Sequence, residues 1–275
     1  DEYTVRLNLS GPWGAGLNML ADRGGIMSSP TSVEALGPDY GWLPSGTGPY
    51  KVNKVVTGTS VQLVRNENYW GRDADGNRLP YLDEVTIRTI RDETVLASAL
   101  RTGEIDVAYL PYKEVASFSR DDRFNIEEMP GGSVALVLVF NVDFPPLNNV
   151  DVRRAIAHAI RPEVINRAIY FNKVMEADSG MWPAGAWAHD PDVKRPHYDL
   201  TKAKEYLKRA GYENGFEFTA VTNNSAVLVP TSEIIRTMLK EIGIVMDIDV
   251  MNAGASTERF FHGRNYGLYI TSWSR

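Results

Sequence analysis

"LDEVTIRTIRDETVLASALRTGEIDVAYL", residues 82–110, places a helical segment between two segments of alternating apolar and polar residues. Residues 84–90 and 104–110 alternate as half-buried β-strands do. Between them, Asp92 is suited to cap a helix whose apolar residues share one face, and Gly103 is suited to end it. A strand, a helix and a strand with short connections predict an α/β sheet with a crossover helix.

The second half of the chain alternates helices and strands more regularly. Pro145 and Pro146 interrupt the chain between an apolar strand at 134–140 and the next helix, so we place a domain boundary there. Residues 1–140 and 141–275 are then two α/β domains. The further elements that we expect are a strand at 3–9, helices at 151–160, 162–171, 199–211 and 231–243, and strands at 216–222, 244–250 and 266–273.

A glycine-rich loop, "LPSGTGPYKVNKVV" at residues 43–56, raises the question of a phosphate site. A phosphate loop follows a strand and opens a helix, so that backbone N–H groups converge on the anion. Here Tyr50, Val52 and Lys54 begin an alternating run that resumes after Gly58. The pattern predicts a β-hairpin and not a phosphate site.

Composition restricts the class of protein. The chain has 275 residues, a formal net charge of −6 and no cysteine. The negative charge argues against a nucleic-acid partner, and the missing thiols exclude disulfides and thiolate metal sites. The longest apolar run, residues 134–140, is much shorter than the roughly 20 residues of a membrane helix. Asp1 follows no secretion signal and Arg275 directly follows a strand, so we expect a piece cut from a longer chain.

Catalytic and metal-binding patterns are weak. His189 and His197 share a loop with two aspartates, but their spacing does not match a metal site, and no nucleophile motif is present. A hydrolase that uses carboxylates in a cleft stays an alternative, because the separation of two carboxylates in space is not visible in a sequence.

Tryptophans give the stronger indication of a binding site. Trp182 and Trp187 stand in a loop of small and polar residues, where they either line a pocket or seal the second domain. Trp273 lies near the end of an apolar strand. Open α/β sheets bind ligands beyond the carboxyl ends of their strands, so its position favours a cleft.

Several stretches together resemble a known family. They are "GTGPYKV" at 46–52, "LVRNENYWG" at 63–71, the opening stretch at 82–110, "FNVDFPPLNNVDVRRAIAHAI" at 140–160, "YDLTKAKEYLKRAGY" at 198–212 and "LKEIGIVMDIDV" at 239–250. Over nearly its full length the chain resembles the extracytoplasmic solute-binding proteins of the peptide, nickel and opine class, family 5, which serve ABC importers.

The resemblance implies a fold and a function. The fold would be the two-lobe α/β architecture of periplasmic binding proteins (class II, cluster C), truncated at both ends, with 1–140 part of the first lobe and 141–275 most of the second. The protein would be no enzyme and need no cofactor. It would capture a small solute, foremost an oligopeptide or dipeptide, with a sugar or metal chelate as alternatives. It would deliver the solute to an ABC permease from a periplasmic or extracellular, membrane-associated position as a lipoprotein.

The resemblance also suggests binding residues. Trp182, Trp187, Tyr269 and Trp273 would contact the solute, and Asn141 would lie at a hinge crossing. The family's anchoring aspartate falls beyond Arg275, and Ile270 stands where the oligopeptide-binding branch has an arginine. A sensor or docking module with a protein partner is a further alternative.

Overall fold

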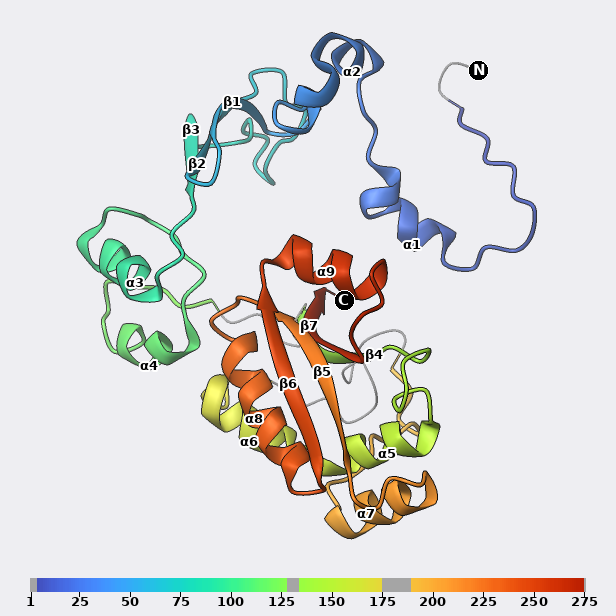
Figure 1. The fold of residues 1–275 in the computed structure, drawn as a ribbon. Helices are drawn as coiled ribbons and strands as arrows, with labels where there is room; N and C mark the ends of the chain where they lie inside the picture. The colour runs from blue at the N-terminus through green and yellow to red at the C-terminus, as the bar shows by residue number, and fades with distance from the viewer. Residues whose placement is uncertain (1–3, 128–133, 175–188, 275) are drawn as a thin grey trace. The chain divides into compact units, whose positions relative to one another are not determined.

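The computed structural model describes residues 4–127, 134–174 and 189–274 (Figure 1). The chain divides into two compact units, Asp1–Ala108 and Tyr109–Arg275, which we call unit one and unit two. This division lies ahead of the lobe boundary predicted after Phe140. The strand at 134–140, which we assigned to the first lobe, is part of the sheet of unit two. The lobe boundary itself stays a prediction.

Unit one contains a three-stranded antiparallel sheet of order β1-β2-β3, formed by β1 (Tyr50–Val56), β2 (Ser60–Arg65) and β3 (Glu84–Arg88). Gly58 has φ 73° in the turn between β1 and β2, a conformation that glycine adopts without strain. The predicted hairpin is therefore confirmed, and no helix follows the glycine-rich loop. The helices of unit one are α1 (Gly16–Leu20), α2 (Pro30–Leu36) and α3 (Glu93–Thr102), with 3-10 turns at Arg23–Gly25 and Gly37–Gly41.

Helix α3 has the predicted ends. The Asp92 carboxylate accepts hydrogen bonds from the backbone N–H groups of Thr94 and Val95, and Gly103 follows the helix in the left-handed conformation. The strand predicted at 104–110 was wrong, because that segment has no β-structure and the Val107 and Tyr109 side chains are 87% and 98% exposed. Residues 4–9 of the strand predicted at 3–9 are not a strand either. Alternation predicts a strand only where a neighbouring strand can pair with it, and none pairs with either segment in the described parts of the chain.

Unit two contains a four-stranded sheet of order β4-β7-β5-β6. Strand β5 (Phe216–Asn223) runs parallel to β6 (Ile244–Met251) and to β7 (Leu268–Ser274), and β4 (Val134–Phe140) is antiparallel to β7. Helix α8 (Leu228–Lys240) connects β5 to β6, and α9 (Ala253–Phe261) connects β6 to β7. Among its described residues the other helices are α4 (Val115–Phe118), α5 (Val150–Ala159), α6 (Pro162–Ile169) and α7 (Leu200–Arg209), with a 3-10 turn at Tyr112–Glu114. The predicted α/β class is confirmed by these parallel crossovers.

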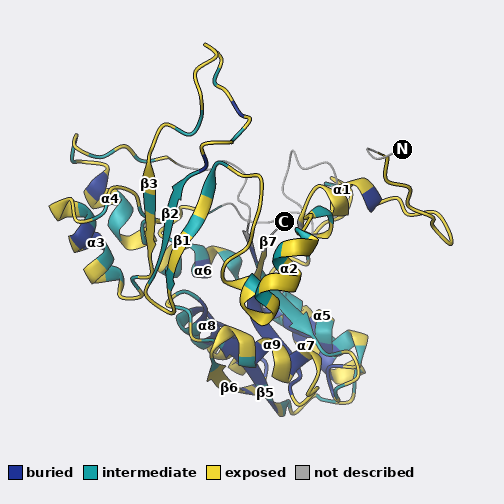
Figure 2. Cartoon of the chain, turned by 90° about the horizontal axis from the view of Figure 1, so that it is seen from above, coloured by how far each residue is buried: buried dark blue, intermediate teal, exposed yellow. Residues whose placement is uncertain are grey.

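In the described residues, the clusters of buried hydrophobic side chains lie in unit two, and only a few residues of unit one are buried. One face of its sheet, including Leu268 and Ile270, packs with α5, α7 and α8, and the opposite face, including Tyr269, packs against α9 through Phe260. Figure 2 shows buried residues gathered on these strands and helices, whereas β1, β2 and β3 carry none. No helix in the described ranges has both the length and the apolar character needed to span a bilayer.

Candidate functional site

The carboxyl edge of the unit two sheet is the first candidate site. The parallel strands β5, β6 and β7 end at this edge, where Trp273 is 40% exposed. Side chains alternate along β7, so Trp273 shares the α9 face with Tyr269 and Thr271. The residue opposite Trp273 on β4 is the small, buried Ala135. The edge therefore presents one large, partly exposed indole at the position where α/β sheets bind ligands.

Tyr269 is buried beneath this edge and connects β7 to α9. Its side chain is only 3% exposed, and its hydroxyl lies 3.0 Å from the Ser256 Oγ and 3.3 Å from the Thr257 Oγ1, both on α9. Burial raises the pKa of Tyr269, but hydrogen bonds with Ser256, Thr257, Thr271 and Asn223 outweigh it and hold the pKa below the usual 10.0. Tyr269 thus fixes α9 to β7, and its burial gives no support to the predicted direct contact with a solute.

Asn141 lies at the opposite end of β7. Its backbone N–H donates to the Gly267 carbonyl at 2.9 Å, and its side-chain amide donates to the Tyr266 carbonyl at 3.2 Å. Trp273 lies six positions beyond Gly267 along β7, which is roughly 20 Å at about 3.3 Å per residue. The structure therefore does not bring Asn141 and Trp273 together, because antiparallel β4 ends where β7 begins. Asn141 lies within unit two, and its predicted place at a hinge crossing stays a prediction.

Two of the predicted solute contacts cannot be placed. Trp182 and Trp187 lie outside the described residues, and their role stays a prediction.

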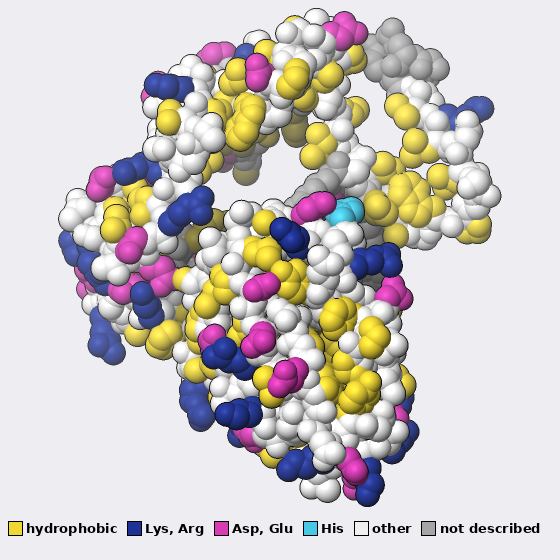
Figure 3. Space-filling model, viewed as in Figure 1, with side chains coloured by type: hydrophobic (Ala, Val, Ile, Leu, Met, Phe, Trp, Pro, Cys, Tyr) yellow, Lys and Arg dark blue, Asp and Glu magenta, His cyan; other side chains and the backbone are white. Residues whose placement is uncertain are grey.

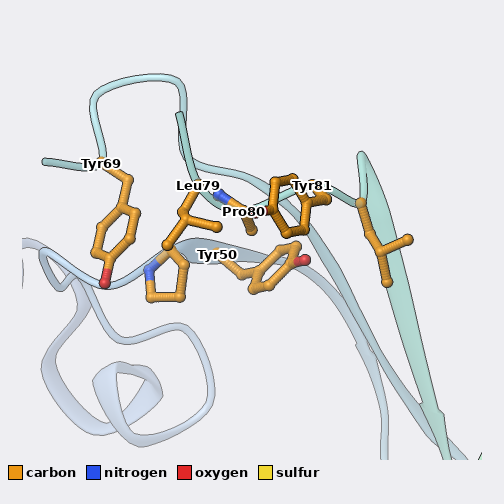
Figure 4. Close-up of a pocket in the computed structure, with 7 residues that line it drawn as sticks. Tyr50, Tyr69, Leu79, Pro80 and Tyr81 are labelled. Carbon is orange, nitrogen blue, oxygen red and sulfur yellow. The ribbon is translucent and has the colours of Figure 1, made fainter. Parts of the chain in front are cut away.

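Unit one has a hollow that sequence reasoning missed (Figure 4). We call it the tyrosine hollow; its volume is about 340 Å³, and its lining residues are Pro49, Tyr50, Tyr69, Leu79, Pro80, Tyr81 and Leu82. The buried Asn66 holds the glycine-rich loop in place: its side-chain amide donates to the Gly48 carbonyl at 2.8 Å, and its backbone N–H donates to the Pro49 carbonyl at 2.9 Å. The glycine-rich loop therefore positions Pro49 and Tyr50 in an apolar hollow.

A hydrogen-bonded loop fixes one side of the tyrosine hollow. The Tyr81 hydroxyl donates to Asp73 Oδ2 at 2.6 Å, and Asn77 donates to the same carboxylate. Hydrogen bonds from Tyr81 and Asn77 lower the pKa of Asp73 from 3.8 to about 2. Asp73 is thus ionised at neutral pH and restrains the Tyr81 side chain.

A second hollow, of about 410 Å³, lies at the amino ends of β5 and β6. Its lining residues are Lys204, Lys208, Glu213, Asn214, Glu241, Ile242 and Gly243. The hollow contains two carboxylates, Glu213 and Glu241, but Glu241 already forms an ion pair with Arg161 and accepts a hydrogen bond from Tyr198. The hollow also lies at the edge opposite to the one where α/β sheets bind ligands. Within the described residues, no three His, Cys, Asp or Glu side chains are grouped for a metal.

The comparisons with known proteins decide the family. The model of the bacterial extracellular solute-binding proteins, family 5, middle region, matches residues 1–275. The chain belongs to this family of solute-binding proteins. The resemblance predicted from the sequence is thus confirmed over the whole chain.

Individual proteins that are similar to this chain agree with the family assignment. The glutathione-binding protein GsiB of Shigella flexneri is 31% identical over 257 residues, which are 92% of this chain and 49% of the relative. The periplasmic binding protein DppA of Helicobacter pylori, solved with the peptide STSA, has a TM-score of 0.82 and 30% identity, covering 97% of this chain and 51% of that one. Staphylococcus aureus NikA, solved with a nickel–histidine complex, has a TM-score of 0.77 at 19% identity, which shows the fold alone. The chain spans about half the length of these relatives.

Proposed function

We propose that the full-length protein captures a small solute outside the cytoplasm and delivers it to an ABC permease without altering it. The observation that carries this proposal is the family 5 match over residues 1–275. GsiB is named for binding glutathione, and the DppA structure holds a peptide, so both relatives are binding proteins. A periplasmic or extracellular location, with attachment to the membrane, follows from the same family.

A peptide is the solute that we propose first. DppA and GsiB, both at 30% identity or above, are binding proteins for a peptide and for glutathione, which is itself a short peptide. Opines and nickel–histidine complexes are the solutes in structures that share only the fold at lower identity. Peptides therefore have the stronger support, and opines or metal chelates are the solutes to compare.

Trp273 is the solute contact that we propose in unit two. Its indole offers a flat apolar face at the carboxyl edge, and such faces pack against side chains or peptide planes. Ile270, at the position of the arginine in the oligopeptide-binding branch, is fully buried in the core. A solute at this edge is therefore held without a cationic side chain from position 270.

Calorimetric titration of the full-length protein with dipeptides, tripeptides including glutathione, opines and nickel–histidine tests the proposal. Trp273→Ala should weaken binding of the preferred peptide by about tenfold or more, the scale of an aromatic contact in a binding site. Trp13→Ala is the matched control, because Trp13 is also 40% exposed but lies in unit one. Binding by none of these solutes, or equal losses in both variants of a folded protein, would contradict the proposal.

A further inference from the structure

The carboxyl edge of the unit two sheet is built from uncharged segments. They are residues 222–232 around the end of β5, residues 250–257 around the end of β6, and β7 itself at 268–274, and none of these residues is Lys, Arg, His, Asp or Glu. Asp249, the carboxylate nearest to the end of β6, accepts a hydrogen bond from the Tyr266 hydroxyl at 2.6 Å. These segments therefore offer a solute amide, hydroxyl and aromatic groups but no charge.

The opposite edge of the same sheet carries many charges. The second hollow, at the amino ends of β5 and β6, has Lys204, Lys208, Glu213 and Glu241 among its lining residues. Figure 3 shows several Lys and Arg side chains at the end of unit two that holds α7. Charged residues make up 23% of the whole chain, so their absence from three segments that meet at one edge is a local property of that edge.

Asn224 lies at the centre of this neutral edge. Strands β5 and β7 pair Thr222 with Ile270, so two positions further along both strands Asn224 is level with Ser272, the neighbour of Trp273. On the other side, the Asn224 backbone N–H donates to the Met251 carbonyl at the end of β6 at 2.8 Å. Neighbouring strands are about 4.8 Å apart, so Asn224 is close to the ends of both β6 and β7.

The side-chain amide of Asn224 is available to a solute. Two other asparagines at this edge use their side-chain oxygens internally: Asn223 accepts from the Ser225 N–H at 3.1 Å, and Asn252 accepts from the Ala255 N–H at 2.9 Å. The Asn224 side chain is exposed and has no hydrogen-bond partner in the described part of the chain. It offers both a donor and an acceptor, which match a peptide amide or an uncharged polar side chain.

A charged group of a solute would be held poorly at this edge. Moving a charge out of water without a counter-charge costs much more than moving a neutral amide that keeps its hydrogen bonds. The neutral edge therefore favours the part of a peptide that is farthest from its ammonium and carboxylate ends.

We propose that Asn224 hydrogen-bonds an uncharged interior residue of a solute peptide, beside Trp273, and that unit two thereby selects against Lys, Arg, Asp and Glu at that position of the peptide. The inference rests on the proposed function and adds the class of solute, which is a peptide of three or more residues with a neutral interior residue. The charged ends of the peptide are then bound by other parts of the protein.

Titration of the full-length protein with its preferred peptide tests the contact. Asn224→Ala should weaken binding by about fivefold, the scale of one hydrogen bond. Asn214→Ala is the matched control, because Asn214 is an exposed asparagine at the amino edge of the same sheet, and its affinity should stay within about twofold of the unmodified protein.

Three results of this titration would overturn the inference. They are an unchanged affinity in Asn224→Ala, an equal loss in both variants, and a preferred solute without an interior residue, such as a dipeptide, an opine or a metal chelate. Binding of no solute at all by the unmodified protein is a different result, because it contradicts the proposed function itself.

A change of charge tests the selectivity. Each interior residue of the preferred peptide is replaced in turn by Gln, Glu and Lys, and at one position the unmodified protein should bind the Gln peptide at least about tenfold more tightly than the other two. Asn224→Asp should reduce the ratio of affinities for the Gln and Lys peptides at that position to below about threefold, because the new carboxylate pairs with the ammonium group. Asn214→Asp should leave this ratio unchanged. Equal binding of the three peptides at every position, or an unchanged ratio in Asn224→Asp, would overturn the inference.

Discussion

The junction between β5 and β6 gives the sharpest test of the unit two sheet. Gly215 and Gly243 precede these two strands, and both have positive φ, 80° and 82°. A Cβ added at Gly215 would lie 1.8 Å from the Gly243 carbonyl oxygen, whereas a Cβ added at Gly243 would meet no atom closer than 3.4 Å. The two positions therefore share the same conformational strain but differ in steric clash.

The expected effects follow from that difference. Left-handed φ costs a residue other than glycine roughly 1–2 kcal/mol, so Gly243→Ala should lower the free energy of unfolding by about 1 kcal/mol after the gain from a stiffer unfolded chain. Carbon and oxygen atoms in contact are about 3.3–3.6 Å apart, so Gly215→Ala must separate the two backbones by roughly 1.5 Å. This displacement disrupts the start of the parallel register, and we expect a loss of about 3–5 kcal/mol.

Urea unfolding followed by circular dichroism measures both variants. The reasoning predicts that Gly215→Ala is less stable than Gly243→Ala by at least about 2 kcal/mol at an unchanged m-value. Equal losses, or a larger loss for Gly243→Ala, would refute the close approach of the two backbones. If Gly215→Ala does not accumulate as a folded protein while Gly243→Ala does, that difference itself confirms the clash, and accumulation of both at equal stability contradicts it.

Three further predictions concern single interactions. Tyr269→Phe removes the hydroxyl that joins β7 to Ser256, and urea unfolding should show a loss of about 1 kcal/mol; no loss would mean that α9 is held by packing alone. Tyr81→Phe should raise the pKa of Asp73 from about 2 toward 3.8 in a carboxyl NMR titration, because the Tyr81 hydroxyl favours the ionised form of Asp73. The stabilisation by Asp73 is present above pH 3.8 and is lost as the pH falls through about 2. An unchanged pKa of Asp73 would contradict this hydrogen bond. Asp199→Ala should cost about 1 kcal/mol of stability in the same urea assay, because the carboxylate caps α7 by accepting from the Lys202 N–H; restoration by Asp199→Asn would confirm the cap, and an equal loss in that variant would contradict it.

Local signals in the sequence predicted the elements whose causes are local. Asp92 caps α3 as expected, Gly58 makes the hairpin turn, and the helices predicted from residues 162 and 199 begin at Pro162 and at the Asp199 cap. The strand predicted at 104–110 failed because alternation does not show whether a partner strand exists. The α/β class was right, but the crossovers that establish it lie in unit two and not in the opening stretch.

The candidate site was predictable only in part. The position of Trp273 at the end of an apolar strand was enough to place it at the carboxyl edge. The distance between Asn141 and Trp273 was not predictable, because the sequence does not show that β4 runs antiparallel to β7 and ends at the opposite edge of the sheet. The tyrosine hollow brings together residues 49–50, 69 and 79–82, and only the pairing of β1 with β2 and of β2 with β3 makes them neighbours.

The central claim is that the full-length protein holds a small solute and leaves it chemically unchanged. Native mass spectrometry of the intact protein, purified from cells without unfolding and then incubated with a defined peptide mixture, tests this claim most directly. The account predicts an added mass that matches one peptide, which is released at its original mass on denaturation. A spectrum with only the unliganded protein, or with cleaved peptide products, would contradict it.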